Sequence, residues 1–397
     1  MFHVKQSKAT AVPLALLAIA LILLAVNMRA PIVMLGSLAP ILKDTLGLTD
    51  GMIGWLGALP MPAFAIGSLL SPYLARRLGL EQSLILMVGL LSLALVVRVL
   101  GDAGLFFVGT GVMALAIGFM NTLGAPLIKK HAPNHIALMT GLLSLCMSLF
   151  AGGVAWAVLP MTQAFGWQIG MGSWAVVGVM TLIIWLIIAK RSKSNSTVTS
   201  QGKSNFNPWA DINAWALAAF MGIQSLLFYG MAAFLPMIGA AKGLPLHRAT
   251  ELALTFQIAA PFTIIALTYL IKRGAPVRVT AVVAAILDAV GVAGLIYMPE
   301  YLHLWSLLMG LGAASIFTLS LMMFSLRTRD AETARDVSGM VQAVGYTIAF
   351  FGPVLLGKLF EIYQDWHMPL MTFLALMVAN IYFAWFATRP YMFESKS

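Results

Sequence analysis

A permanently charged side chain stands in an apolar stretch near the start of the chain. Arg29 lies in the sequence LLAVNMRAPIV, and no Asp or Glu precedes Asp44. A guanidinium presents a planar fork of N–H donors, which suits small anions and electron-rich heteroatoms. Charged groups inside a membrane usually face protein or a water-filled cavity, so we expect Arg29 to contact a ligand. The alternatives are a structural ion pair and a side chain that snorkels to the membrane surface.

Asn27 is the nearest polar neighbour of Arg29. The two residues lie about 200° apart around a regular helix, so they point to different sides. Pro31 lacks the amide that would bond the carbonyl of Asn27, and a bend there could direct both side chains into one cavity. We therefore include Asn27 with Arg29 in the predicted site.

Tyrosines, a serine and amides recur at helical spacing in the second half of the chain. Ser225 and Tyr229 share a helix face four residues apart, as do Gln342 and Tyr346. Together with Gln224 they could face Arg29 and bind a small, polar, flat ligand. The alternative is that the rings pack and the hydroxyls bond backbone groups.

The remaining candidates each have a structural explanation beside the functional one. Asn121, Gln257 and Ser144 could contact a ligand or simply join helices by hydrogen bonds. Arg98 could bind substrate, snorkel, or pair with Asp102 one turn later. Asp288 is a carboxylate deep in an apolar run and could carry an exchangeable, coupling proton or form a structural pair.

Composition places all of these residues in a membrane. The chain has 397 residues, of which 60% are hydrophobic and 10% charged, with a mean hydropathy of +0.92. A spanning helix needs about 20 apolar residues, and twelve such segments occupy almost the whole sequence. We expect an all-α integral membrane protein with spans near 12–38, 51–75, 82–100, 104–128, 136–160, 170–190, 211–238, 247–271, 276–298, 302–326, 335–357 and 368–388.

The distribution of charge predicts the topology. With the N-terminus inside, 18 of the 24 basic residues fall on inside loops or ends and only four on outside connections. This positive-inside bias explains the net charge of +10 without a nucleic acid partner. We read residues 12–38 as a retained helix, not a cleaved signal. We expect the protein to lie in a bacterial-type inner membrane with both termini on the cytoplasmic side. We also expect it to be a monomer.

The chain divides at a polar segment. Residues 191–205 read RSKSNSTVTSQGKSN and resemble a solvated connector. A shift of 196 residues places Pro40, Arg76 and Arg77 on Pro236, Lys272 and Arg273. We predict two pseudo-symmetric six-helix bundles, residues 1–190 and 211–397, joined by a cytoplasmic linker at 191–210.

Several motifs in this layout resemble those of the major facilitator superfamily over essentially the full chain. NMRAP, VVRVLG, GFMNTLGAPLIKK, GIQSLLFYG and SGMVQAVGYTIAFFGP are similar to the bacterial cyanate permease and 2-nitroimidazole transporter family. The resemblance implies the major facilitator fold, alternating access between two bundles, and cyanate-like anions or azoles as substrates. It also implies that the fourth helix lines the cavity, which supports Asn121.

The loop between the second and third spans departs from the superfamily pattern. That pattern places an Asp-Arg pair after a Gly and three residues, whereas this chain reads PYLARRLGLEQ. Arg76 holds the usual acid position, followed by Arg77 and Gly79. The gating contact of the usual Asp must be remade by Glu81 or be absent.

No sequence pattern indicates an enzyme or a bound cofactor. The chain has no phosphate-binding loop, metal-ligand motif or nucleophile–base pair, and its single cysteine, Cys146, excludes a disulfide. We predict a secondary active transporter of a small anion or small polar heterocycle, with a co-transported proton left open. The alternatives are a proton-coupled drug exporter and, in another class, a non-transporting receptor or a channel.

Overall fold

The protein is almost entirely helical. The structure, a computed structural model, describes residues 12–194 and 206–394, so residues 195–205 of the predicted linker lie outside the described part. The first group of helices comprises α1 (Leu14–Leu46), α2 (Asp50–Ala58), α3 (Pro60–Leu78), α4 (Leu80–Val97), α5 (Ala103–His131), α6 (Ile136–Phe165), α7 (Trp167–Gly172) and α8 (Trp174–Ser194). The second comprises α9 (Ile212–Ala241), α10 (Leu246–Lys272), α11 (Val277–Tyr297), α12 (Leu302–Leu326), α13 (Ala331–Tyr363) and α14 (His367–Ala387).

The expected membrane-spanning architecture is confirmed. Among the described residues, 12 candidate spans have the length and hydropathy to cross a bilayer. Two of them contain a break: α2 ends at Ala58 before Pro60 opens α3, and α7 ends at Gly172 before α8. A proline fits the first turn of a helix, where its missing N–H costs no hydrogen bond, so α3 restarts there.

Sharp turns join the helices where the chain reverses. Gly79 separates α3 from α4 with a φ of 87°, a conformation that residues with a Cβ rarely adopt. The Gly at this position therefore sets how closely the two helices follow each other.

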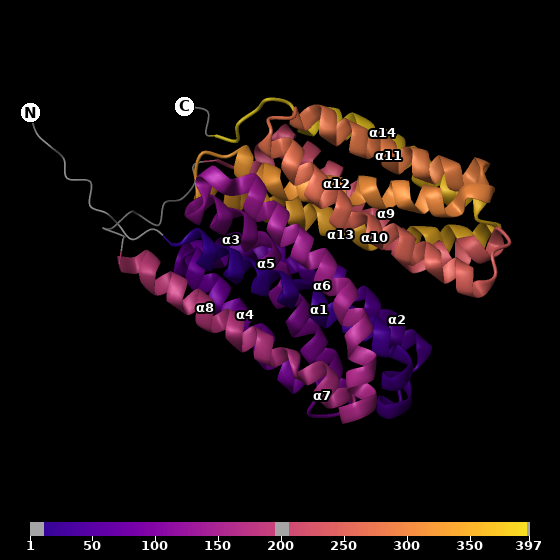
Figure 1. The fold of residues 1–397 in the computed structure, drawn as a ribbon, viewed down its shortest axis with the longest axis horizontal. Coiled ribbons are helices and arrows are strands. Elements are labelled where there is room, and N and C mark those ends of the chain that lie inside the picture. The colour runs from indigo at the N-terminus through magenta and orange to yellow at the C-terminus, as the bar shows by residue number, and fades with distance from the viewer. Residues whose placement is uncertain (1–11, 195–205, 395–397) are drawn as a thin grey trace, which may run out of the picture.

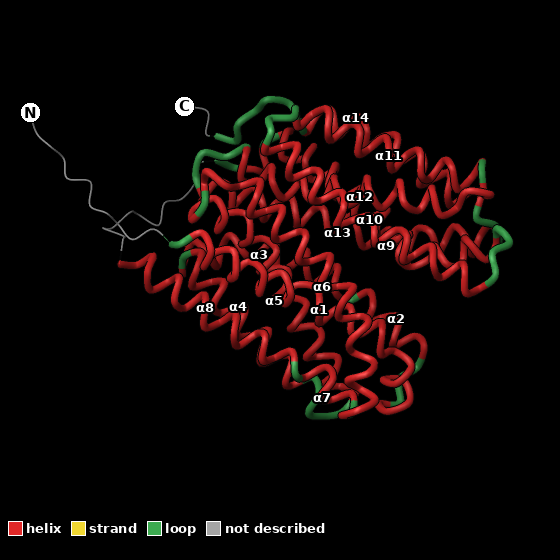
Figure 2. The backbone as a smooth tube through the Cα atoms, in the orientation of Figure 1, coloured by secondary structure: helices red, strands yellow, loops and turns green. Residues whose placement is uncertain are grey.

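The helices form two groups that meet on one side of the molecule. Figure 1 shows α1–α8 and α9–α14 lying close together where α3 ends and α13 begins, and separating toward the opposite side. We call the first the proximal side and the second the distal side. The tube in Figure 2 shows the same divergence, with short loops at both ends of the helices.

Candidate functional site

Arg29 lies between the two helix groups. It sits midway along α1, its side chain is half-buried, and its guanidinium carbon lies 5.7 Å from the ring centre of Phe317 on α12. Arg29 forms no ion pair with a carboxylate in the described part of the chain. Arg29 is thus a half-buried cation that contacts an aromatic ring of the other helix group.

One of the predicted tyrosines, Tyr346, lies near this guanidinium. Tyr346 on α13 interacts electrostatically with both Arg29 and Tyr229 of α9. Its ring meets that of Phe64 on α3 edge to face, with centres 5.2 Å apart. Tyr346 therefore lies within electrostatic range of the cation of the first group, and the part of Tyr229 and Tyr346 in ligand binding stays a prediction.

Asn27 does not accompany Arg29. Its amide donates to Thr181 Oγ1 at 2.8 Å, to the carbonyl oxygen of Leu23 at 2.8 Å and to that of Val177 at 3.5 Å. Helix α1 runs unbroken through Pro31. The idea that a bend directs both side chains into one cavity is wrong, because the 200° separation holds and Asn27 binds α8 instead.

Arg98 neither snorkels nor pairs with Asp102. The side chain is fully buried, and Nη1 donates to the carbonyl oxygen of Pro31 at 3.3 Å and contacts the sulfur of Met113 at 3.1 Å. Asp102 instead accepts a hydrogen bond from Leu105 N and caps α5. Both structural explanations offered above are wrong, since Arg98 turns inward and holds the segment of α1 that carries Arg29.

Gln342 and Asn121 lie where the groups meet on the proximal side of Tyr346. Gln342 Nε2 donates to the backbone carbonyl of Asn121 at 3.3 Å and to Ser338 Oγ at 2.8 Å. Ser338 Oγ in turn donates to the carbonyl oxygen of Thr122 at 3.0 Å. In this conformation Gln342 and Ser338 join α13 to α5 by hydrogen bonds, and we call this contact between the helix groups the proximal seam.

The other predicted residues are dispersed. Gln224 accepts a hydrogen bond from Ser225, and both are buried in α9. Ser144 is buried on α6, while Gln257 is exposed on α10. Asp288 is fully buried on α11, where a Cβ on Gly312 of α12 would come within 2.4 Å of Oδ1.

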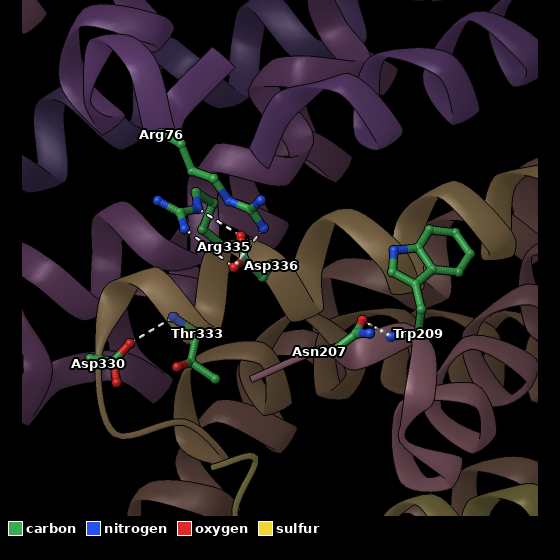
Figure 3. Close-up of polar contacts among 7 residues, drawn as sticks. All are labelled: Arg76, Asn207, Trp209, Asp330, Thr333, Arg335 and Asp336. Carbon is green, nitrogen blue, oxygen red and sulfur yellow. Dashed lines mark hydrogen bonds and ion pairs between the residues drawn. The ribbon is translucent and has the colours of Figure 1, made fainter. Parts of the chain in front are cut away.

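An ion pair locks the proximal side. Nη2 of Arg76, at the end of α3, lies 3.0 Å from Oδ2 of Asp336 on α13 (Figure 3). Arg335 Nε binds Oδ1 of the same carboxylate at 2.8 Å, and both Arg335 and Asp336 are buried. Arg76 thus places a positive charge where the superfamily pattern has a negative one. Its partner on α13, Asp336, is an acid.

Glu81 makes a second network inside the first group. Its carboxylate lies 2.6 Å from Lys130 Nζ and 2.8 Å from His131 Nε2, and Ser192 Oγ donates to it at 3.3 Å. These contacts tie α4 to α5 and α8. Neighbouring Arg77 stacks on Tyr73, 4.4 Å from the ring centre, and is exposed.

Sequence reasoning missed three residues that the structure brings to these sites. Phe317 and Phe64 looked like ordinary apolar residues of spanning helices, and no local signal marks them. Asp336 carried a usable signal, since it is an acid beside Arg335 at the start of a span. That position is where a partner for Arg76 could have been sought.

Comparisons with known proteins identify the family and the fold. Residues 15–353 match the Major Facilitator Superfamily. The chain is 31% identical over 362 residues to a 2-nitroimidazole transporter of Escherichia coli, covering 90% of this chain and 92% of that protein. It is 23% identical over 374 residues to the cyanate transport protein CynX of the same organism, covering 92% and 96%.

The fold has a close counterpart among solved structures. The proton:xylose symporter XylE bound to 6-bromo-6-deoxy-D-glucose superposes with a TM-score of 0.76 over 94% of this chain and 95% of that one, at 11% identity. The resemblance predicted from NMRAP and the other motifs is confirmed.

Proposed function

Because the chain belongs to the Major Facilitator Superfamily, we propose that it is a secondary active transporter of a small anion or small polar heterocycle, working by alternating access. The twelve candidate spans among its described residues and its bacterial transporter relatives make it a multi-pass membrane protein. We assign it to an inner membrane with both termini in the cytoplasm, on the positive-inside distribution of its basic residues.

Arg29 carries this proposal. It is a half-buried cation at the contact between the two helix groups, and it makes no ion pair within the described residues. Retaining an unpaired guanidinium inside a membrane is costly, and an anionic or electron-rich ligand would offset the cost during transport. The relatives that carry nitroimidazole and cyanate supply the first compounds to test.

The two helix groups supply the motion. We propose that α1–α8 and α9–α14 move as two domains, and that the conformation described is closed on the proximal side by the Arg76–Asp336 ion pair and the Gln342 seam. Opening would break these contacts and join the groups on the distal side. A substrate bound between Arg29 and Tyr346 would then be accessible from the opposite side of the membrane.

Counterflow in proteoliposomes tests the proposal. Vesicles preloaded with an unlabelled azole or cyanate should accumulate the labelled compound transiently, with a rate that saturates. A channel would equilibrate without this overshoot. Binding of the compounds to purified protein without any counterflow would refute the carrier function.

A further inference from the structure

The proposed transport gives a role to the Arg76–Asp336 ion pair but none to the cavity beside it. The cavity has a volume of about 410 Å³, within the range of roughly 300–1,000 Å³ typical of small-molecule sites. Its walls come from α3, from α13 and from the short η2 helix (Pro208–Ala210) that precedes α9. The cavity therefore lies at the proximal seam between the two groups.

The polar end of this cavity carries surplus positive charge. Asp336 is already neutralised by Arg335, so the cluster of two arginines and one aspartate has a net charge of +1. Arg76 is the half-exposed member, with 45% of its side chain accessible, and it lines the cavity. An anion placed there would balance the cluster and accept hydrogen bonds from a guanidinium.

The remaining wall is apolar and aromatic. Leu69, Tyr73 and Trp209 line the cavity, and each is about half exposed. Tyrosine and tryptophan at the edge of a spanning helix are typical of the boundary between headgroups and hydrocarbon. A cation beside such a wall matches the two ends of a phospholipid, namely a phosphate and the start of its acyl chains.

The η2 wall is held firmly in place. Asn207 Oδ1 accepts a hydrogen bond from Trp209 N at 3.1 Å (Figure 3). The ring of Phe206 packs against that of Phe393, with centres 5.7 Å apart. At the junction with α9, Tyr391 donates to Asp211 at 2.7 Å, and this hydrogen bond raises the pKa of Tyr391 to about 12. These contacts fix the η2 wall of the cavity against the C-terminal segment.

We propose that this cavity binds the phosphate of an anionic phospholipid from the leaflet on the proximal side. Arg76 holds the phosphate, while Leu69, Tyr73 and Trp209 contact the glycerol and the first acyl carbons. Basic pockets between spanning helices recognise anionic headgroups in this way. The inference does not depend on which substrate is transported, and it survives if no counterflow is found.

Two variants that break the same ion pair separate the lipid site from the pair itself. Arg76→Gln removes the surplus cation, whereas Asp336→Asn raises the net charge of the cluster. Binding of phosphatidylglycerol and phosphatidylcholine to the purified full chain is measured by native mass spectrometry. Arg76→Gln should weaken phosphatidylglycerol binding about tenfold or more, the equivalent of one charge-assisted hydrogen bond. Asp336→Asn loses the same ion pair between the helix groups but keeps the Arg76 cation, so the folded fraction of this less stable variant should bind phosphatidylglycerol more tightly than Arg76→Gln does.

Control experiments test whether the bound anion is a lipid headgroup or a soluble phosphate, and whether it binds in this cavity. Arg77→Gln removes an exposed neighbour outside the cavity and should leave binding unchanged, and Arg76→Lys, which keeps the charge, should retain most of it. Equal affinity for the two lipids, or equal losses in Arg76→Gln and Arg77→Gln, would overturn the proposal. Displacement of phosphatidylglycerol by millimolar inorganic phosphate would also overturn it, by showing that a soluble anion is the ligand.

Discussion

Arg76 and Asp336 join the two helix groups across 3.0 Å, with Arg76 45% exposed and Asp336 1% exposed. This asymmetry means that the two ends of the ion pair are not equivalent. Loss of Arg76 leaves the Arg335–Asp336 pair intact. Loss of the Asp336 carboxylate instead strands a buried Arg335, which is far more costly.

Arg76→Gln should therefore open the proximal side modestly. A half-exposed pair contributes up to about 1 kcal/mol, or about a fivefold change in the ratio of closed to open conformers. Spin labels would report a longer distance when attached to Asn134→Cys, in the turn between α5 and α6, and to Lys272→Cys, at the end of α10, with Cys146 replaced by Ser. Arg77→Gln is the matched control and should leave the distance distribution unchanged, whereas a closed population equal to that of the unaltered protein would contradict the gate.

Asp336→Asn should destabilise the fold as well as the closed conformer. Removing one partner of a buried pair typically costs about 3–5 kcal/mol. Thermal unfolding in detergent should show a much larger drop than for Arg76→Gln. Similar unfolding temperatures for the two variants would show that Arg335 finds another partner.

Gly339 tests the same seam without altering any charge. A Cβ at this position on α13 would lie 2.3 Å from Cγ of Pro72 on α3, and the proline ring cannot rotate away. Gly339→Ala should push the groups apart and increase the open population seen by the spin labels. Gly345→Ala, on the same helix, meets nothing closer than 3.7 Å and should not. If both alanine variants had the same open population, the contact between α3 and α13 would have enough space for an added methyl group at position 339.

Arg29→Lys should lose most of its substrate affinity although the charge remains. Lysine offers a point charge without the planar fork that could lie along a flat anion and over Phe317. Thermal-shift titration with small anions and azoles measures this, since a ligand of the folded state raises stability with concentration. An affinity unchanged in both Arg29→Lys and Arg29→Ala would remove Arg29 from the site.

The sequence predicted the membrane-spanning helices and the place of Arg29 within one of them better than it predicted which residues contact one another. An isolated charge in an apolar run is visible locally, so Arg29 could be identified, and hydropathy located the twelve spans. The partner of Asn27 could not be found in this way, because Thr181 lies on another helix and ranks as an unremarkable polar residue of α8. Arg98 was misread for the same reason, since its acceptor, the Pro31 carbonyl, is a backbone group.

Asn27→Ala should weaken the packing of α1 on α8 and leave substrate affinity nearly intact. Hydrogen bonds between spanning helices contribute about 0.6–1.7 kcal/mol. The coupling with Thr181→Ala, measured in a double-mutant cycle of unfolding, should account for most of the loss. If Asn27→Ala instead abolished substrate binding with no change in stability, Asn27 would have to be assigned to the substrate site.

Asp288 offers the last test, because it separates coupling from substrate recognition. The carboxyl is fully buried on α11 and lies against Gly312 of α12, whereas Arg29 contacts Phe317 of α12. If Asp288 carries a coupled proton, which is the first of the two roles considered for it above, Asp288→Asn should abolish accumulation driven by a pH gradient while counterflow, which needs no net proton movement, continues. Asp44→Asn, at an exposed acid, is the matched control. Normal accumulation by Asp288→Asn would assign this carboxyl to helix packing alone, since a group that never exchanges its proton cannot link the gradient to the substrate.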